Sequence, residues 1–332
     1  MHERPSVTFA CVGENTSVWH RRIARLVKSL RTFGSAAADA PISVYVVNSC
    51  DDRFRELLSE LGAGVEIVSP PIPGLPYANK LEMFSRFDPD SAQRLVALDC
   101  DTVVLGDPSQ FGADVDLAAK PADSDFLTAG DWKRFFDWLG VEPPPRRFRT
   151  STLGQRTYPY FNSGVVVVRG SLVPALAREW QRWCSAMPEF FALHPSHASI
   201  STFADQLALT ATILKLGIDV RPLPVHANYP AHLPLHRTTR TTALAPVVYH
   251  YHSFVDGRGF LRATADRSTN AKLDFLNQWE ASVLSLNYDG LARPGFRDSI
   301  RYVLRGQRWY QARSMRSLRA RRAQRTVARR RT

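Results

Sequence analysis

The sequence predicts an α/β fold, a Rossmann-like and mostly parallel sheet layered between helices, with a basic appendage at the C-terminal end. In the first half of the chain, short runs of β-branched residues alternate with helical patterns, which is the order typical of parallel strands joined by covering helices. The charge is uneven, because 14 of the 43 basic residues but only one of the 31 acidic residues lie between 293 and 332. The other 29 basic and 30 acidic residues leave the body close to neutral.

Two strand and helix pairs open the chain. Apolar runs predict the strands, and the second helix has Asp51 or Asp52 as its N-cap and Gly62 as its end. The predicted order is strand Val7–Val12, helix Trp19–Phe33 ending near Gly34, strand Ile42–Val47, helix Asp51–Leu61 and strand Val65–Val68.

The rest of the body continues the alternation with one irregular excursion. The predicted order is a helix beginning at Asn79–Phe84, strand Arg94–Leu98, strand Asp116–Ala119, an irregular excursion over Asp123–Tyr160, strand Val165–Val168, helix Pro174–Ser185, helix Thr202–Leu216 and strand Val247–His252. We expect a main domain over 1–265, a helical or irregular extension over 266–292, and an Arg-rich amphipathic or disordered tail over 293–332.

The composition is that of a folded protein, with 44% hydrophobic and 22% charged residues. The N-terminus lacks the basic start and apolar run of a secretory signal, and no run approaches the ~18 apolar residues of a membrane span. These features predict a cytoplasmic protein, or one that is peripheral on the inner face of the membrane. The four cysteines are far apart, so we expect them to be reduced and mostly buried.

Asp99 and Asp101 follow the apolar strand Arg94–Leu98 directly. Ligands bind beyond the carboxyl ends of strands in open α/β sheets, and two carboxylates at that edge can converge on one hard cation. Mg²⁺ or Mn²⁺ held in this way neutralises a diphosphate leaving group. The alternative is that the pair is only a solvated turn or a helix cap.

Four segments in the same order resemble the glycogenin-like glycosyltransferases of family 8, which have the GT-A fold. The matching segments are Asn79-Lys80-Leu81, Arg94–Leu105 with its Asp-x-Asp, Phe161-Asn162-Ser163-Gly164-Val165, and Asp205-Gln206. The resemblance implies a metal-dependent hexosyltransferase. Such an enzyme moves a sugar from a nucleotide-diphospho-sugar, with a UDP-sugar favoured, to an acceptor hydroxyl with retention of configuration.

The resemblance also implies roles for single residues. Asp99 and Asp101 would bind the metal, with Asp99 also near the donor ribose or sugar, and Lys80 would lie close to the donor. The residues expected to face the transferred sugar are Asn162, Asp205 and Gln206, and those expected along the nucleotide are Cys11, Val12 and Trp19.

A histidine on the late strand would be the third metal ligand. His250 matches the family pattern, but His252 shares its strand face, so periodicity does not separate them. The family's Lys-Pro-Trp is missing, and Arg258 stands near its place as a substitute cation.

Two other function classes compete with this interpretation. A haloacid-dehalogenase-like phosphatase would use Asp99 as a nucleophile, but its motif normally lies on the first strand of the domain, whereas three strands precede Asp99 here. A non-enzymatic, basic protein would bind membranes or nucleic acid, but the neutral body makes nucleic acid an unlikely partner.

The tail 293–332 carries apolar residues between its arginines, the pattern of a basic amphipathic helix. We expect it to contact an anionic membrane surface, where the acceptor resides. That acceptor is a glycan, a lipid-linked molecule or a protein.

Overall fold

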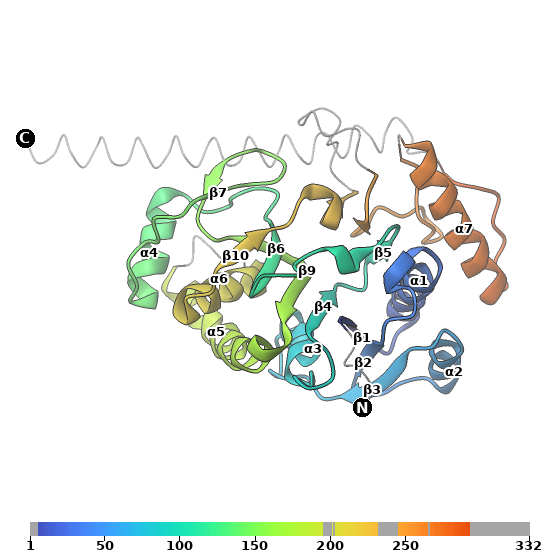
Figure 1. Cartoon of the computed structure of the whole chain (residues 1–332), viewed down its shortest axis with the longest axis horizontal. Helices are drawn as coiled ribbons and strands as arrows, with labels where there is room; N and C mark the ends of the chain where they lie inside the picture. Colours follow the sequence, from blue (N-terminus) through green and yellow to red (C-terminus); the bar gives the residue numbers. More distant parts are fainter. Residues whose placement is uncertain (1–5, 195–200, 202, 232–244, 265, 293–332) are drawn as a thin grey trace, which may run out of the picture.

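The computed structural model describes residues 6–194, 201, 203–231, 245–264 and 266–292 (Figure 1). Its centre is a seven-stranded sheet in the order β10-β6-β9-β4-β1-β2-β3. All neighbouring strands in it are parallel, except that β9 is antiparallel to both β4 and β6. The strands are β1 (Thr8–Glu14), β2 (Ile42–Val47), β3 (Gly64–Val68), β4 (Arg94–Leu98), β6 (Leu117–Pro121), β9 (Phe161–Arg169) and β10 (Val220–Pro222).

Helices cover both faces of this sheet (Figure 1). Alternate residues of β1 show the layering, because Ala10 packs on the face covered by α3, α4, α5 and α6, and Cys11 packs on the face covered by α1 and α2. This arrangement confirms the predicted fold class. The helices are α1 (Ser17–Phe33), α2 (Asp52–Glu60), α3 (Glu82–Ser85), α4 (Ala129–Leu139), α5 (Val173–Leu193), α6 (Ala204–Leu216) and α7 (Arg267–Val283).

Smaller elements complete the body. A three-stranded sheet has the order β11-β12-β5, and α7 packs against it through Leu273 and Leu276. Its strands are β5 (Thr102–Val104), β11 (Tyr229–Pro230) and β12 (Val248–His250), and a separate hairpin consists of β7 (Phe148–Arg149) and β8 (Arg156–Thr157). The 3₁₀ helices are η1 (Ser35–Ala37), η2 (Pro76–Leu81), η3 (Pro108–Gln110), η4 (Gly170–Leu172) and η6 (Val225–Asn228).

Three elements differ from the predicted ones. The segment expected to start a helix at Asn79 is the 3₁₀ helix η2 followed by the single turn α3. The excursion Asp123–Tyr160 contains α4, which begins with a capping box between Thr128 and Asp131. The late strand ends at His250, and His252 lies beyond it.

The C-terminal extension over 266–292 contains α7, which docks on α1. The Arg25 guanidinium forms a buried ion pair with the carboxylate of Glu280, which also accepts a hydrogen bond from Arg21. Within the described part of the chain, no helix has the length and apolar character needed to cross a membrane. The predicted tail 293–332 lies outside the described residues.

Candidate active site

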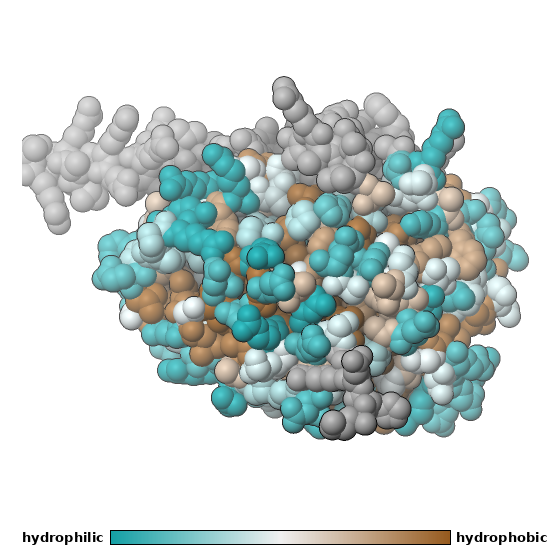
Figure 2. Space-filling model, in the orientation of Figure 1, coloured by the Kyte–Doolittle hydropathy of each residue, from teal (hydrophilic) through white to brown (hydrophobic). Residues whose placement is uncertain are grey.

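A cavity of about 270 Å³ opens beyond the carboxyl ends of β1 and β4. Hydrophilic residues gather over the middle of the visible face, where β4 and β9 lie in Figure 1 (Figure 2). The cavity collects most of the predicted site residues: Val12, Trp19, Lys80, Asp99, Asp101, Asn162, Asp205, Gln206, His250 and His252.

Two predicted residues do not line this cavity. Cys11 alternates with Val12 along β1, so its side chain points to the opposite face, where burial raises the pKa of the thiol to about 12. Arg258 donates to the Asn287 carbonyl at 3.1 Å and to Asp289 at 3.2 Å, away from the cavity. The structure therefore does not bring either residue to the cavity, in contrast to the sequence interpretation.

Asp101, His250 and His252 form a cluster whose ligand atoms all lie within 4.8 Å of one another. The antiparallel pairing of β12 with β5 places His250 opposite Thr102 and thus beside Asp101. Nε2 of His250 lies 3.1 Å from Oδ1 of Asp101, and Nδ1 of His252 lies 3.8 Å from Oδ2. Burial by itself would raise the pKa of the Asp101 carboxyl, but the two imidazoles outweigh it and hold that pKa below its usual value.

His252 reaches the cluster through an unusual backbone conformation. Its φ of +49° is left-handed, which is uncommon for a residue other than glycine. The turn stacks its ring on that of His250 at 3.7 Å between centroids. The sequence pattern suggested that the two histidines share a strand face, but His252 lies beyond the end of the strand. Both imidazoles nevertheless face Asp101. Strain of this kind costs about 1–3 kcal/mol and is concentrated at functional sites.

Asp99 belongs to a second cluster, centred on Lys80. The Lys80 ammonium lies 3.1 Å from Asp99 and 3.0 Å from Asp205, and it donates to the Ser163 hydroxyl at 2.8 Å. Burial would lower the pKa of Lys80, but its two carboxylate partners outweigh burial and raise it. Burial raises the pKa of Asp99 above its usual value. Lys80 is thus a cation held in place by its partners in the lining of the cavity.

Asn162 is held by its neighbours at the edge of the cavity. Its Oδ1 accepts from the Gly164 amide at 2.9 Å and from Nδ2 of Asn228 at 2.8 Å, and Oδ1 of Asn228 lies 3.0 Å from Nδ1 of His250. Sequence reasoning assigned no role to Asn228 or Ser163. Ser163 lies inside a motif that gave a signal, whereas Asn228 follows a proline-rich stretch and is recognised only by its contacts.

Asp205 and Gln206 enter the cavity from the first turn of α6. The indole of Trp180 on α5 donates to the Asp205 carbonyl at 3.0 Å, which fixes the start of α6 on its neighbour. Both side chains are nearly buried, although they line the cavity. Their position is therefore set by helix packing.

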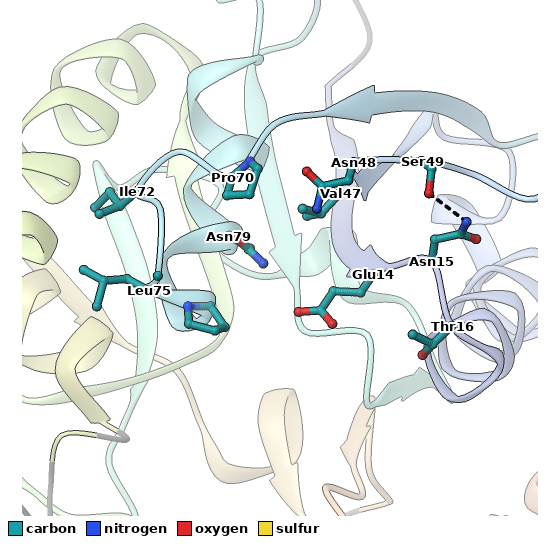
Figure 3. Close-up of a pocket in the computed structure, with 12 residues that line it drawn as sticks. Glu14, Asn15, Thr16, Val47, Asn48, Ser49, Pro70, Ile72, Leu75 and Asn79 are labelled. Carbon is teal, nitrogen blue, oxygen red and sulfur yellow. Dashed lines mark hydrogen bonds between the residues drawn. The ribbon is translucent and has the colours of Figure 1, made fainter.

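A second cavity of about 380 Å³ adjoins the first, and Glu14, Pro76 and Asn79 line both (Figure 3). Among the described residues, Oδ1 of Asn79 is buried without a hydrogen-bond partner. Polar side chains at the ends of β1 and β2 face apolar ones from the loop before η2, including Ile72 and Leu75 (Figure 3). The two cavities together form an extended site.

The mostly parallel sheet layered between helices, with a polar site beyond its strand ends, is a fold of the GT-A type. Residues 10–217 match the Rhodobacterales glycosyltransferase domain family, and the chain belongs to that family. A comparison with curated proteins gives no match. The family match favours the glycosyltransferase over the phosphatase and the non-enzymatic binding protein, and it does not test the resemblance to family 8.

Two solved structures, LgtC and WbbM, show the same fold at low sequence identity, and a third aligns less well. The galactosyltransferase LgtC, in complex with donor and acceptor sugar analogues, aligns with a TM-score of 0.50 and 15% identity, over 83% of this chain and 95% of that one. The bifunctional glycosyltransferase WbbM aligns with a TM-score of 0.50 and 13% identity, over 86% of this chain and 52% of that one. Glycosyltransferase GlyE of Streptococcus pneumoniae aligns with a TM-score of 0.48 and 15% identity, over 86% of this chain and 66% of that one.

Proposed function

We propose that this glycosyltransferase moves a hexose from a nucleotide-diphospho-sugar, with a UDP-sugar favoured, to an acceptor hydroxyl, assisted by a divalent metal and with retention of configuration. One observation carries the proposal: a cluster of possible metal ligands and a fixed cation line the same cavity. The diphosphate of a nucleotide-diphospho-sugar is an anionic group that a bound metal ion and a nearby ammonium can bind together.

The residues of the first cluster fit a divalent transition metal. One carboxylate and two imidazoles suit Mn²⁺ better than Mg²⁺, because imidazole is a poorer ligand for the harder ion. Asp101, His250 and His252 would hold the metal, which would neutralise charge on the departing diphosphate. Asp99 remains a predicted ligand, but its carboxylate is held by Lys80, which supports a position beside the donor ribose or sugar.

The second cluster supports a role at the transferred sugar. Lys80 brings a positive charge to the donor, and Asp205 and Gln206 would orient the sugar hydroxyls. Asp205 shares one oxygen, Oδ2, between Lys80 at 3.0 Å and the Ser163 hydroxyl at 2.5 Å. Both contacts stabilise its negative charge and weaken it as a nucleophile. This supports front-face attack by the acceptor hydroxyl, with the leaving phosphate taking the proton.

The second cavity gives room for the nucleoside part of the donor. It continues the first cavity past Glu14 and Asn79. Trp19, the side chain predicted to lie near the base, lines the first cavity and not the second. The acceptor would be a glycan, a lipid-linked molecule or a protein, at a membrane surface reached by the basic tail. The enzyme would then act in the cytoplasm or on the inner face of the membrane.

The test is the release of nucleoside diphosphate from a panel of UDP- and GDP-sugars with Mn²⁺, compared with the same assay in excess EDTA. We expect release from one sugar nucleotide only, and its loss in EDTA. Formation of an aspartyl-phosphate on Asp99 with simple phosphate esters, detected by mass spectrometry, would instead identify a phosphatase.

A further inference from the structure

We propose that Asn228 is a positioning residue for the metal site, because it fixes the orientation and the tautomer of His250. The proposal rests on the metal-assisted transfer proposed above and adds a residue outside every motif of the sequence. It follows from a chain of hydrogen bonds that begins at a backbone amide. Because that amide can only donate, it determines which atom is donor and which is acceptor along the whole chain.

The chain of hydrogen bonds begins at the backbone amide of Gly164, which can only donate. Its partner, 2.9 Å away, must therefore be the oxygen of the Asn162 side chain and not the nitrogen. The Asn228 atom 2.8 Å from that same oxygen must in turn be a donor, which makes it Nδ2. The orientation of both amides thus follows from a group that cannot flip.

The other end of the Asn228 amide is then an acceptor. Its Oδ1 lies 3.0 Å from Nδ1 of His250, so Nδ1 carries the hydrogen of that contact. A neutral imidazole protonated at Nδ1 leaves its lone pair on Nε2, which lies 3.1 Å from an oxygen of Asp101, so a bound metal, and not a hydrogen, would join these two atoms. Histidines that bind metals generally donate their other N–H to an oxygen in this way. The hydrogen-bond chain therefore presents the metal-binding nitrogen to the cluster.

Burial makes this contact hard to replace. Asn228 has no exposed surface, and His250 is 2% exposed, so water cannot take over a lost hydrogen bond. Gly164 contributes a second constraint, because a Cβ at this position would collide with the His250 ring. The strand β9 thus acts on the histidine in two ways, through the hydrogen-bond chain that passes by Asn228 and through close packing.

A buried asparagine can also serve stability alone, and Asn277 is a matched example. It is fully buried as well, and its amide accepts from the Leu261 N–H and donates to the Leu261 carbonyl, each at 2.9 Å. It contacts no residue of the metal cluster. Replacing Asn277 with Ala therefore measures how much stability the fold loses when a buried amide of this kind is removed.

The experiment measures Mn²⁺ binding to the full-length protein by electron paramagnetic resonance, together with thermal unfolding. Asn228→Ala should raise the Kd for Mn²⁺ about 10–100-fold, the effect typical of losing a partner of a metal ligand. Asn228→Asp keeps an oxygen facing Nδ1 but loses the donor to Asn162, so it should recover only part of the affinity. Asn277→Ala should lower the unfolding temperature and leave the Kd unchanged.

Two results would overturn the inference alone: parent-like Mn²⁺ affinity in Asn228→Ala, or an equal loss of affinity in Asn277→Ala. Absence of Mn²⁺ binding by the parent protein would instead overturn the metal site of the proposed function, and this inference with it. If Asn228→Ala fails to fold, Asn162→Ala tests the same chain, because it removes the acceptor that orients Asn228. Parent-like Mn²⁺ affinity in that variant would also count against us.

Discussion

The two carboxylates of the Asp-x-Asp motif have different partners. Asp101 faces two imidazoles, whereas Asp99 faces the Lys80 ammonium. Successive carboxylates in a turn out of a strand can serve different clusters when the chain bends between them. The motif therefore connects the Asp101 cluster with the Lys80 cluster across one cavity.

This difference predicts unequal effects on metal binding. Losing a hydrogen-bond partner of a metal ligand typically lowers metal affinity roughly 10–100-fold. Asp101→Asn should lower Mn²⁺ affinity by at least this much, because it removes the charge of a proposed ligand itself. Asp99→Asn should weaken Mn²⁺ binding less and slow the release of nucleoside diphosphate. Mn²⁺ titration and donor hydrolysis on both variants separate the two roles. Equal losses of Mn²⁺ affinity in the two variants would show that Asp99 binds the metal as Asp101 does.

Gly164 allows a close approach that no other residue permits. Gly164→Ala places a Cβ against the His250 ring, so we expect the ring to move and Mn²⁺ affinity to fall by about tenfold or more. Gly257→Ala is the matched control, because a Cβ there meets nothing within 4 Å. Mn²⁺ titration compares the two variants. A parent-like Kd for Gly164→Ala would show that the histidine tolerates the added methyl group.

At the scale of elements, α7 is joined to α1 by a buried charge cluster. The side chains of Arg25 and Glu280 are only 2% and 3% exposed, and Glu280 also bonds Arg21. Both arginines reach the backbone of the loop beyond the histidines, at Arg258 and Gly259. The extension therefore supports the segment that follows the metal cluster.

Removing the acid of this cluster should destabilise the fold. Glu280→Gln leaves two arginines without their buried counter-charge, and breaking such a pair typically costs about 3–5 kcal/mol. Asp137→Asn is the control, because its pair with Lys133 on α4 is exposed and worth under about 1 kcal/mol. Urea unfolding measures both changes. Similar free energies of unfolding for the two variants would refute the idea that α7 is held by this pair.

At the scale of the whole molecule, charge and catalysis are separated along the sequence. The body is close to neutral, and the positive charge lies in 293–332. Among the residues that the structure describes, those that line the candidate site all lie before position 253. A membrane contact through the tail would thus be independent of donor chemistry.

Deletion of 293–332 should abolish binding to acidic liposomes and leave nucleoside-diphosphate release intact. Each basic residue near an anionic leaflet contributes about 1 kcal/mol, and salt screens this attraction. Co-sedimentation with liposomes at low and high salt measures the first effect, and the donor assay the second. Equal binding by the truncated and full-length proteins at low salt would assign the tail another purpose.

The sequence by itself determined the layered sheet and most of its strands, because their apolar periodicity is local. Strand Ile42–Val47 and strand Arg94–Leu98 were predicted at the boundaries that the structure has. Helix α4 was missed because its capping box lay within a stretch rich in prolines and aromatics. The strand end before the Asp-x-Asp motif indicated Asp99 and Asp101, because a strand end followed by carboxylates is a local signal. The other predicted residues that line the cavity were implied by the resemblance to a known family.

Only the tertiary structure decided how these residues are partnered. That Asp99 meets Lys80, that both histidines face Asp101, and that Asn228 orients His250 depend on contacts between segments far apart in the chain. The pairing of β12 with β5 and the left-handed turn at His252 create them. Periodicity assigns a side chain to a face of its own element, whereas a contact across 149 residues, as between Asp101 and His250, is fixed only when the elements pack.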